Sequence, residues 1–580
     1  MLAPHVLREY AFLADGRRGA LIGPSGDITF LCVPDWHSSA VFAELVGGRG
    51  SYSIRPANDR FVWGGQYEPG SLIWTSHWVT TSGVIECDEA LAYPGDARRA
   101  VLLRRVRAID RDAVLEVVLD VRAGFGRTPA TAVRRERDGW SGRAGRLRWQ
   151  WTGVPRARPD GTGRLVARLR VPAGRHHDLT FVIGTGEDPP PVEPAAAWQA
   201  TRQAWAAAGT GPRHCIAPRD ARHAVTVLRG MTHPDGGLVA AATTSLPERA
   251  ESGRDYDYRY AWIRDQCLTG QACAAAGVSD LLDASVRYVT ARLLADGPDL
   301  APAYTVDTGE RIPAQHRLAR LPGYPGGGPV HTGNNVHGQF QLDMFGEALL
   351  LYAAAARHDR LEPDARKAMT IAADTAAARW TEPDAGIWEL DDRHWTHSKL
   401  ICVAGLRAAA RHVPAAQAAA WYGLADTILT DTDRHGLHPS GRWQRSRDDP
   451  RVDAALLLPA IRGALPTADL RSTATLAAVH AELVQDGYVY RYRADDRPPG
   501  EAEGAFQLCG FLAAHATHLT GDPVTAARLF ERSRAACGPS GILSEEYDVG
   551  ERQMRGNLPQ AFVHAALLGA AVALAEPRTG

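Results

Sequence analysis

The spacing of apolar residues changes once along the chain, and this change constrains the fold more than any other feature. From about residue 216 onward, apolar and alanine-rich segments recur at the spacing of amphipathic α-helices. About twelve such segments are present: residues 218–231, 259–276, 279–294, 341–358, 362–380, 396–411, 414–430, 453–462, 469–484, 504–519, 523–537 and 559–575. The connections between them alternate between short ones and long ones that are rich in Gly, Pro, Trp, Tyr and paired charges.

This alternation predicts how the helices are arranged. If successive helices run up and down, every long connection falls at the same end of the bundle. Twelve helices in six antiparallel pairs then form an (α/α)6 barrel with six long loops along one rim. Because loops on a rigid scaffold commonly carry function, we expect the functional site at this rim.

The chain before residue 190 has a different pattern. Runs such as "AVLEVVLDVRAG" and "DLTFVIGTG" alternate or stay apolar over four to eight residues, and Gly, Pro and Asp separate them. Many short strands with turn signals predict an antiparallel β-sandwich. We therefore expect an N-terminal β-sandwich domain at 1–190, a linker at 191–215 that follows a run of three prolines, and a catalytic (α/α)6-barrel domain at 216–580.

Charge and cysteine content exclude several classes of function. The 580 residues include 65 basic and 66 acidic ones, so no charge-driven binding to nucleic acid or to an anionic membrane is expected. The eight cysteines show no CxxC spacing, which argues against a zinc site or a disulfide framework. The first residues lack the apolar core of a secretory signal, and no segment has the length of a membrane span. We expect a cytoplasmic protein; its oligomeric state cannot be predicted from these features.

The long loops carry aromatic side chains next to carboxylates and arginines. Examples are "GRDYDYRYAWIRDQCLT" (253–269), "PDAGIWELDDRHW" (383–395) and "GILSEEYDVGERQMRGNLPQ" (541–560). Such loops suit a polyhydroxyl ring ligand, because aromatic rings stack on sugar faces while Asp and Arg bond hydroxyls directionally. Cleavage of a glycosidic bond needs two carboxyl groups, and Glu389 with either Glu545 or Glu546 are the candidates.

Several ordered motifs together resemble a known family. "ATTSLPE", "YDYRYAWIRD", "QLDMFGE", "GIWE" followed by "HWTHSK", "EGAFQLCGF" and "LSEEYD" followed by "GNLPQAFVH" are similar to the glucoamylase family, glycoside hydrolase family 15. Its bacterial members include glucoamylases, glucodextranases and trehalases, and the N-terminal residues are similar to theirs as well. The resemblance implies an (α/α)6 barrel behind a β-sandwich and an inverting mechanism that releases β-glucose from a non-reducing end.

The resemblance also implies roles for the two carboxyl groups. Glu389 matches the general acid, and its apolar neighbours would keep it protonated, whereas the alternative is a solvated loop Glu. Glu545 matches the general base that activates water, with Glu546 as its rival and as a further residue of the binding site.

Other residues match the substrate-binding positions of the family. Arg264 and Asp265 correspond to the pair that holds the terminal glucose, although a structural salt bridge is the alternative. Tyr258 and Trp262 correspond to the aromatic lining, and Trp388 and Trp443 are further candidates for the pocket wall. No cofactor or metal is expected, because the HxxH formed by His394 and His397 lacks a third ligand at metal-binding spacing.

These features predict an inverting exo-acting hydrolase of short α-glucosides of the isomaltose or maltose type. A trehalase of the same family is the alternative, and a non-catalytic sugar-binding protein, which would lack one of the two carboxyl groups, is a third possibility. The stretch after Glu389, "LDDRHW", is shorter than in many relatives and lacks their Arg. Since this stretch borders the site of the leaving sugar, the identity of that sugar stays open.

Overall fold

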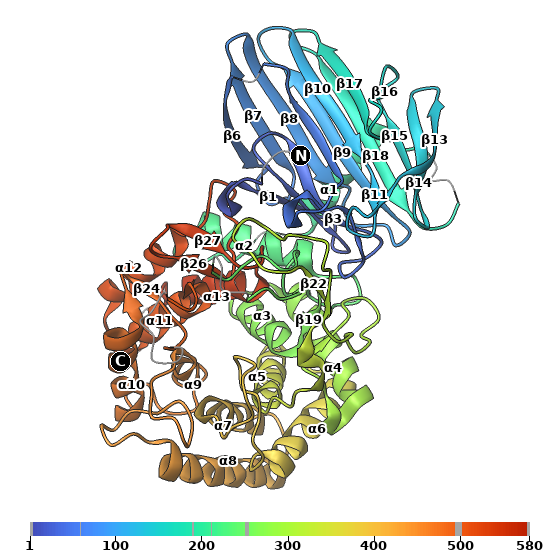
Figure 1. The fold of residues 1–580 in the computed structure, drawn as a ribbon. Coiled ribbons are helices and arrows are strands. Elements are labelled where there is room, and N and C mark those ends of the chain that lie inside the picture. The colour runs from blue at the N-terminus through green and yellow to red at the C-terminus, as the bar shows by residue number, and fades with distance from the viewer. Residues whose placement is uncertain are drawn as a thin grey trace.

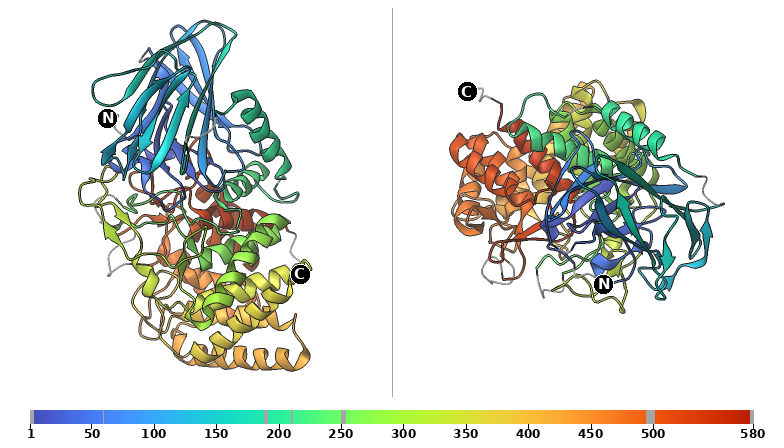
Figure 2. Two further views of the ribbon diagram at one scale, coloured as in Figure 1. Left: turned by 90° about the vertical axis from the view of Figure 1, so that its right-hand side faces the viewer. Right: turned by 90° about the horizontal axis from the view of Figure 1, so that it is seen from above.

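The protein consists of a β-domain followed by a ring of helices (Figure 1). The computed structural model describes residues 4–58, 60–187, 191–209, 211–249, 254–493 and 501–576. The β-domain lies against one side of the helical ring, as the two turned views show (Figure 2).

The β-domain is a sandwich of two antiparallel sheets. One sheet has the order β1-β2-β3-β5-β10-β17-β16, with β4 paired to β3. Its strands are β1 (Ala11–Ala14), β2 (Gly19–Ile22), β3 (Asp27–Cys32), β4 (Ala40–Phe42), β5 (Ser51–Pro56), β10 (Ala113–Asp120), β16 (Arg158–Pro159) and β17 (Leu165–Val171). The other sheet has the order β13-β14-β15-β18-β9-β8-β7-β6. Its strands are β6 (Phe61–Tyr67), β7 (Trp74–Thr80), β8 (Gly83–Leu91), β9 (Arg99–Ala108), β13 (Thr131–Glu136), β14 (Gly139–Ala144), β15 (Leu147–Thr152) and β18 (His176–Gly184).

The sandwich forms because its strands alternate in polarity. In β10, Leu115, Val117 and Leu119 are buried, while the residues between them are partly exposed. These side chains belong to one core cluster with Trp151 and Phe181 of the opposite sheet. A period of two places one apolar face of each sheet toward the other, as the sequence predicts.

The segment expected to be a linker contains a helix. α1 (Pro194–Ala207) begins with a proline at its first position, and the carboxylate of Glu193 caps it by accepting bonds from two backbone amides. The helix contacts β9 and β18, and Trp205 stacks on Tyr93 with ring centroids 3.9 Å apart. Most of this range is therefore a helix that packs on the sandwich. Pro189 and Pro190 lie outside the described residues.

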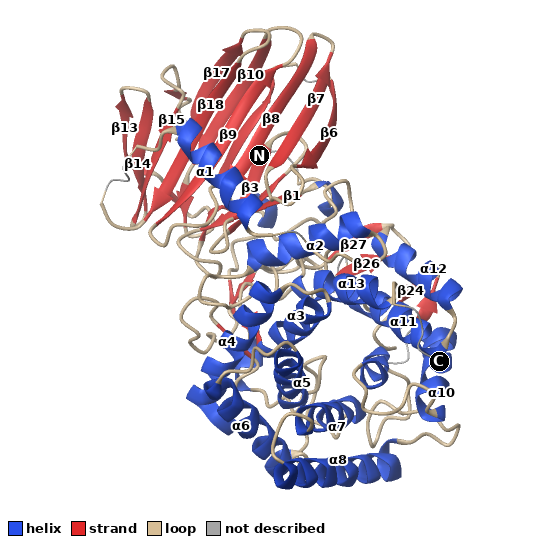
Figure 3. Cartoon of the chain, turned by 180° about the vertical axis from the view of Figure 1, so that it is seen from behind, coloured by secondary structure: helices blue, strands red, loops and turns tan. Residues whose placement is uncertain are grey.

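The second domain is an (α/α)6 barrel, as predicted (Figure 3). Six inner helices each contact the next around the ring: α3 (Ile263–Ala275), α5 (Asp343–Arg357), α7 (Thr396–Ala410), α9 (Leu458–Ile461), α11 (Gln507–Thr520) and α13 (Ala561–Ala573). Six further helices lie outside them: α2 (Pro218–Met231), α4 (Ser279–Asp296), α6 (Pro363–Arg379), α8 (Ala415–Gly436), α10 (Leu470–Leu483) and α12 (Pro523–Arg534). Each of the twelve expected segments coincides with or overlaps one of these helices, although some of the helices, such as α4 and α8, extend beyond their segments, and each inner helix follows a long connection.

Short strands organise these long connections. They are β19 (Ala261–Trp262) with β20 (Ala303–Tyr304), β21 (His316–Arg317) with β22 (His331–Thr332), β23 (Val484–Gln485) with β24 (Tyr488–Val489), and β25 (Ala505–Phe506) with β26 (Glu546–Asp548) and β27 (Gln553–Arg555). In the β-domain, β11 (Arg122–Ala123) pairs with β12 (Thr128–Pro129). Within the described residues, no helix combines the length and apolar character needed to cross a membrane.

The β-domain supports one loop of the barrel rim. Arg259 is fully buried, pairs with Asp257 at 2.8 Å and donates a hydrogen bond of 2.7 Å to the backbone oxygen of Ser38 in the β-domain. Tyr260 stacks on His37 of the same domain, with ring centroids 5.7 Å apart. The loop before α3 is therefore fixed from both sides of the domain boundary.

Candidate active site

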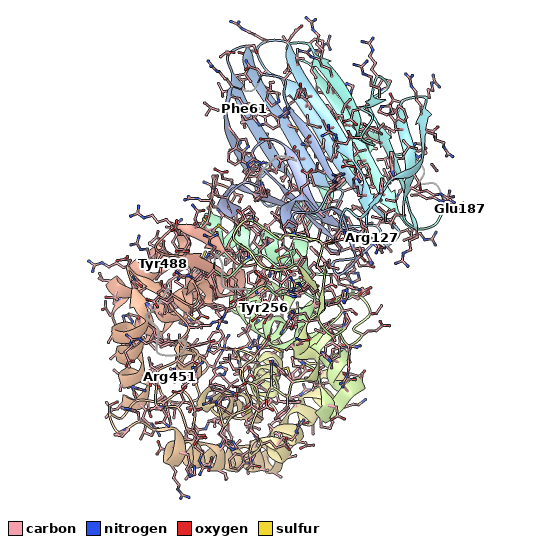
Figure 4. The ribbon with its side chains drawn as sticks, viewed as in Figure 1. Phe61, Arg127, Glu187, Tyr256, Arg451 and Tyr488 are labelled. Atoms are coloured by element: carbon pink, nitrogen blue, oxygen red, sulfur yellow. The ribbon has the colours of Figure 1, made fainter. Side chains whose placement is uncertain are left out.

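A pocket of about 220 Å³ lies at the rim of the barrel. Five of the six long connections contribute to its wall, and Leu268, Leu508 and Phe562 of the inner helices also line it. Of the predicted site residues, seven line this pocket: Tyr258, Trp262, Arg264, Asp265, Trp388, Glu389 and Glu545. Tyr256, another lining residue, is labelled in Figure 4. The pocket thus lies at the rim of long loops, where the loop pattern predicts a site.

Glu389 reaches the pocket from a tight turn. The backbone amide of Leu390 bonds to the carbonyl of Ala385 at 2.9 Å, and Gly386 has a φ of 67°. Glu389 itself has a φ of 57°, a left-handed conformation that costs a non-glycine residue about 1–3 kcal/mol. Strain of this kind at a residue that faces a pocket points to a functional reason for keeping it.

The carboxylate of Glu389 has polar surroundings. Its Oε1 accepts hydrogen bonds from the indole nitrogen of Trp262 at 2.6 Å and from the Arg264 guanidinium at 3.2 Å. The expected apolar surroundings are not found, because the sequence neighbour Trp388 bonds to Asp453 and its ring packs against Phe506. In a turn, the side chains of adjacent residues point in different directions, so the residues that flank Glu389 in the sequence do not describe the environment of its carboxyl group.

Arg264 and Asp265 occupy the first turn of α3. Arg264 lies 3.6 Å from Asp265 and donates a hydrogen bond of 3.0 Å to Gln341. Burial raises the pKa of Asp265 to about 7, although the Arg264 guanidinium opposes this shift. Oδ1 of Asp265, the oxygen that lies 3.6 Å from Arg264, is buried and has no hydrogen-bond partner among the described residues.

Glu545 lies directly before β26 and is almost completely buried. Burial raises the pKa of Glu545 well above its usual range, and the nearby Glu248 carboxylate adds to this effect. The Arg491 guanidinium and a hydrogen bond with Tyr258 act in the opposite direction. Oε2 of Glu545 also has no hydrogen-bond partner in the described part of the chain.

Two predicted binding residues lie outside the pocket wall. Glu546 points away from Glu545, as successive strand residues do, and its Oε2 accepts a hydrogen bond of 2.7 Å from the Gly504 amide. Trp443 is 1% exposed, and the Arg471 guanidinium lies 5.1 Å from the centre of its ring. The loop that carries Trp443, 437–453, contributes no described residue to the pocket, so the expected position of Trp443 in the wall is wrong.

Sequence reasoning did not identify other charged residues of the pocket. Glu248, Arg254 and Arg491 all line it. Glu248 belongs to the "ATTSLPE" motif, and Arg491 lies between two tyrosines in the fifth long connection. Pairing acidic residues of one loop with basic residues of another would have identified both. Such pairing requires knowing which loops lie next to each other in the fold, and the spacing of residues along the chain does not give this information.

An (α/α)6 barrel with two carboxyl groups, an arginine and aromatic side chains in a rim pocket defines a class of enzymes that cleave glycosidic bonds. Residues 222–572 match the family described as glycosyl hydrolases family 15, and residues 3–142 match a family described as trehalase-like, N-terminal. The chain belongs to glycosyl hydrolases family 15, as its motifs indicate, and it is a glycoside hydrolase of the exo-α-glucosidase type.

The similarity to known proteins extends over nearly the whole chain. A trehalase of Mycobacterium tuberculosis is 32% identical, and the match covers 98% of this chain and 89% of that protein. A trehalase of Mycolicibacterium smegmatis is 30% identical, with 98% and 91% covered. A bacterial glucoamylase solved in complex with acarbose has the same fold, with a TM-score of 0.68 at 12% identity over 99% of this chain and 96% of that one.

Proposed function

We propose that the chain hydrolyses the disaccharide trehalose with inversion of configuration, at the pocket that Glu389 and Glu545 line. The observation that carries this proposal is the pairing of two pocket carboxyl groups with Arg264 and Asp265, in a chain whose full-length relatives include trehalases. The match of the N-terminal residues to a trehalase-like domain supports the same substrate.

Each side chain has one task in this mechanism. Arg264 and Asp265 bond the hydroxyls of the glucose that is transferred to water. Glu389 donates a proton to the glycosidic oxygen, and Glu545 accepts a proton from the attacking water. The C–O bond to the leaving glucose breaks as the new C–O bond to water forms on the opposite face of the ring. Solvent then returns the proton from Glu545 to Glu389.

Short α-glucosides of the isomaltose or maltose type are the second candidate substrates. Their support is the stretch after Glu389: Leu390 lines the pocket, while Asp391 and Asp392 are exposed. A short stretch of this kind leaves room for leaving sugars that are not joined through their anomeric oxygen, in contrast to the leaving glucose of trehalose.

A panel of disaccharides tests the proposal. Purified full-length protein is incubated with trehalose, maltose, isomaltose, kojibiose or nigerose, and the initial rate of glucose release is measured. The matched control is Glu545→Ala, which keeps Tyr258, Arg264 and Asp265 but lacks the base. We expect the highest kcat/KM for trehalose and at least a hundredfold loss in the control. A higher kcat/KM for isomaltose or maltose would contradict trehalose as the substrate. If no disaccharide is cleaved, the proposed reaction is wrong.

A further inference from the structure

Three carboxyl groups meet behind the wall of the pocket. Glu248, Glu503 and Glu546 come from three different long connections, all are buried, and their oxygens lie within 4.8 Å of one another. We call these three residues the carboxyl cluster. Glu546 is the sequence neighbour of Glu545, and Glu248 lines the pocket, so the cluster adjoins the proposed base.

The Arg491 guanidinium lies among the three carboxyl groups. Its Nη2 is 2.8 Å from Glu503, 3.3 Å from Glu248 and 3.8 Å from Glu546, and its Nε donates to both oxygens of Glu503 at 2.9 Å. The rings of Phe506, Tyr492 and Trp388 lie within 5.8 Å of the same guanidinium. Arg491 is therefore a fixed, largely dehydrated counter-charge for the cluster.

In the carboxyl cluster and around Glu545, acidic side chains outnumber basic ones. Four carboxyl groups face Arg491 and Arg254, and Arg254 lies 2.7 Å from Glu503 and 3.9 Å from Glu248. Unpaired anions are costly where water is excluded, so four carboxyl groups beside two guanidinium groups favour the protonated form of those that are left without a counter-charge. In agreement, burial raises the pKa of Glu248 to about 7 and raises the pKa of Glu546 well above its usual range.

Backbone contacts connect Glu248 to Glu545. The amide of Gly556 donates a hydrogen bond of 2.8 Å to the carbonyl of Pro247, next to Glu248. A Cβ at Gly556 would lie 2.9 Å from the Cβ of Glu545 and 3.1 Å from its Oε2. The absence of a side chain at Gly556 thus lets Glu545 pack against the segment that carries Glu248.

The proposed mechanism requires an ionised Glu545, yet its surroundings favour the protonated form. We propose that Glu248 and Arg491 are positioning residues that act in opposite directions on the charge of Glu545. Glu248 holds a proton on Glu545, and Arg491 favours the carboxylate that accepts a proton from water. This inference rests on the proposed function, because it takes Glu545 as the base.

Other titratable groups face this pair. Besides Glu248 and Arg491, the charged or titratable groups that act on Glu545 are Tyr258, Glu389 and Glu546. Those that act on Glu248, besides Arg491, are Glu503, Arg254 and Asp255. A change at Glu248 or Arg491 alters the charge next to Glu545 while leaving both proposed catalytic carboxyl groups in place.

The test is the pH dependence of kcat/KM, measured from pH 4 to 9 with the disaccharide of the panel that the wild type cleaves fastest. The acidic limb of this profile reports the pKa of the base in the free enzyme. Glu248→Gln should move the acidic limb down by about 1 pH unit, because Gln never takes up the negative charge that Glu248 acquires as the pH rises through about 7. Arg491→Met should move it up by about the same amount, and Arg491→Lys, which keeps the charge, by less.

Glu347→Gln is the matched control. Glu347 is a buried carboxylate of α5 that accepts a hydrogen bond of 2.6 Å from Gln271, and it belongs neither to the pocket wall nor to the carboxyl cluster. The acidic limb of the pH profile of Glu347→Gln should coincide with that of the wild type. Circular dichroism establishes that each variant folds, and if Arg491→Met does not fold, the downward shift in Glu248→Gln decides.

Two outcomes would overturn the inference. Acidic limbs that coincide in Glu248→Gln and wild type, with Glu545→Ala inactive, would leave the proposed function intact and remove the role of Glu248. In the second outcome, EDTA abolishes the activity of the wild type and a divalent cation restores it, whereas Glu503→Gln does not respond to the cation. This result would place a metal ion in the carboxyl cluster and contradict the role of Arg491 as its counter-charge. An active Glu545→Ala would instead refute the proposed function itself.

Discussion

Replacing Glu389 by Gln tests the assignment of the acid. We expect trehalose hydrolysis to fall about 10²–10⁴-fold, the usual contribution of a general acid, which corresponds to about 2.7–5.4 kcal/mol of transition-state stabilisation. Gln has nearly the same shape, and its amide oxygen can still accept the 2.6 Å hydrogen bond from Trp262. Arg264 keeps its contacts with Asp265 and Gln341. The pocket should therefore persist, and the loss should reflect the missing proton.

The assay compares two substrates that differ in their need for that proton. The glucose that leaves trehalose needs protonation, whereas fluoride leaves α-glucosyl fluoride without it. Glu389→Gln should hydrolyse the fluoride within about tenfold of the wild-type rate, since Glu545 still activates water. Glu545→Ala should lose activity on both substrates. Equal losses on both substrates in Glu389→Gln would refute its role as the acid, and a reversed pattern in the two variants would exchange their roles.

The remaining predictions concern single side chains. Glu545→Ala should lose activity at least a hundredfold more than Glu546→Ala, because only Glu545 lines the pocket, and initial rates on trehalose measure the difference. Trp443→Phe should lower the melting temperature and leave KM unchanged, since Trp443 is buried outside the pocket; a raised KM would contradict its placement. The melting temperature of Asp265→Asn should rise relative to that of the wild type as the pH rises from about 4 to about 7, and thermal unfolding measures this difference. Burial holds the pKa of Asp265 at about 7, against about 4 when unfolded, so the wild type loses stability as pH rises through this interval.

The barrel was predictable because its signal is long and repeated. Outer helices such as α2 and α12 bury one apolar face, inner helices such as α5 and α13 are apolar on nearly all sides, and both patterns are visible as long segments. The alternation of short and long connections sets the order of the ring. The sandwich was visible where strands are buried, as in β10 and β18. Polar edge strands such as β13, with mostly exposed side chains, gave no such signal. α1 was missed because the run of prolines before it suggested a connection, although its alanines favour a helix.

The site was predictable only where a motif names a residue. Glu389, Arg264 and Asp265 follow from family motifs, and in the structure Arg264 donates a hydrogen bond to Glu389 and lies 3.6 Å from Asp265. The polar surroundings of Glu389 and the carboxyl cluster behind Glu545 depend on contacts between loops far apart in the sequence. Trp443 lies in a long loop of similar composition to the others, but in the structure its ring is buried beside Arg471 and away from the pocket.

The stereochemistry of trehalose cleavage tests the central claim most directly. Inversion requires carboxyl groups roughly 6.5–9.5 Å apart, with a water between the base and the anomeric carbon, whereas retention requires about 5–5.5 Å. Proton NMR of an early reaction mixture, recorded before mutarotation, distinguishes the two. We expect equal amounts of β-glucose, from the sugar attacked by water, and α-glucose, from the leaving sugar whose anomeric centre is untouched. Early formation of α-glucose alone would contradict a single displacement by Glu389 and Glu545.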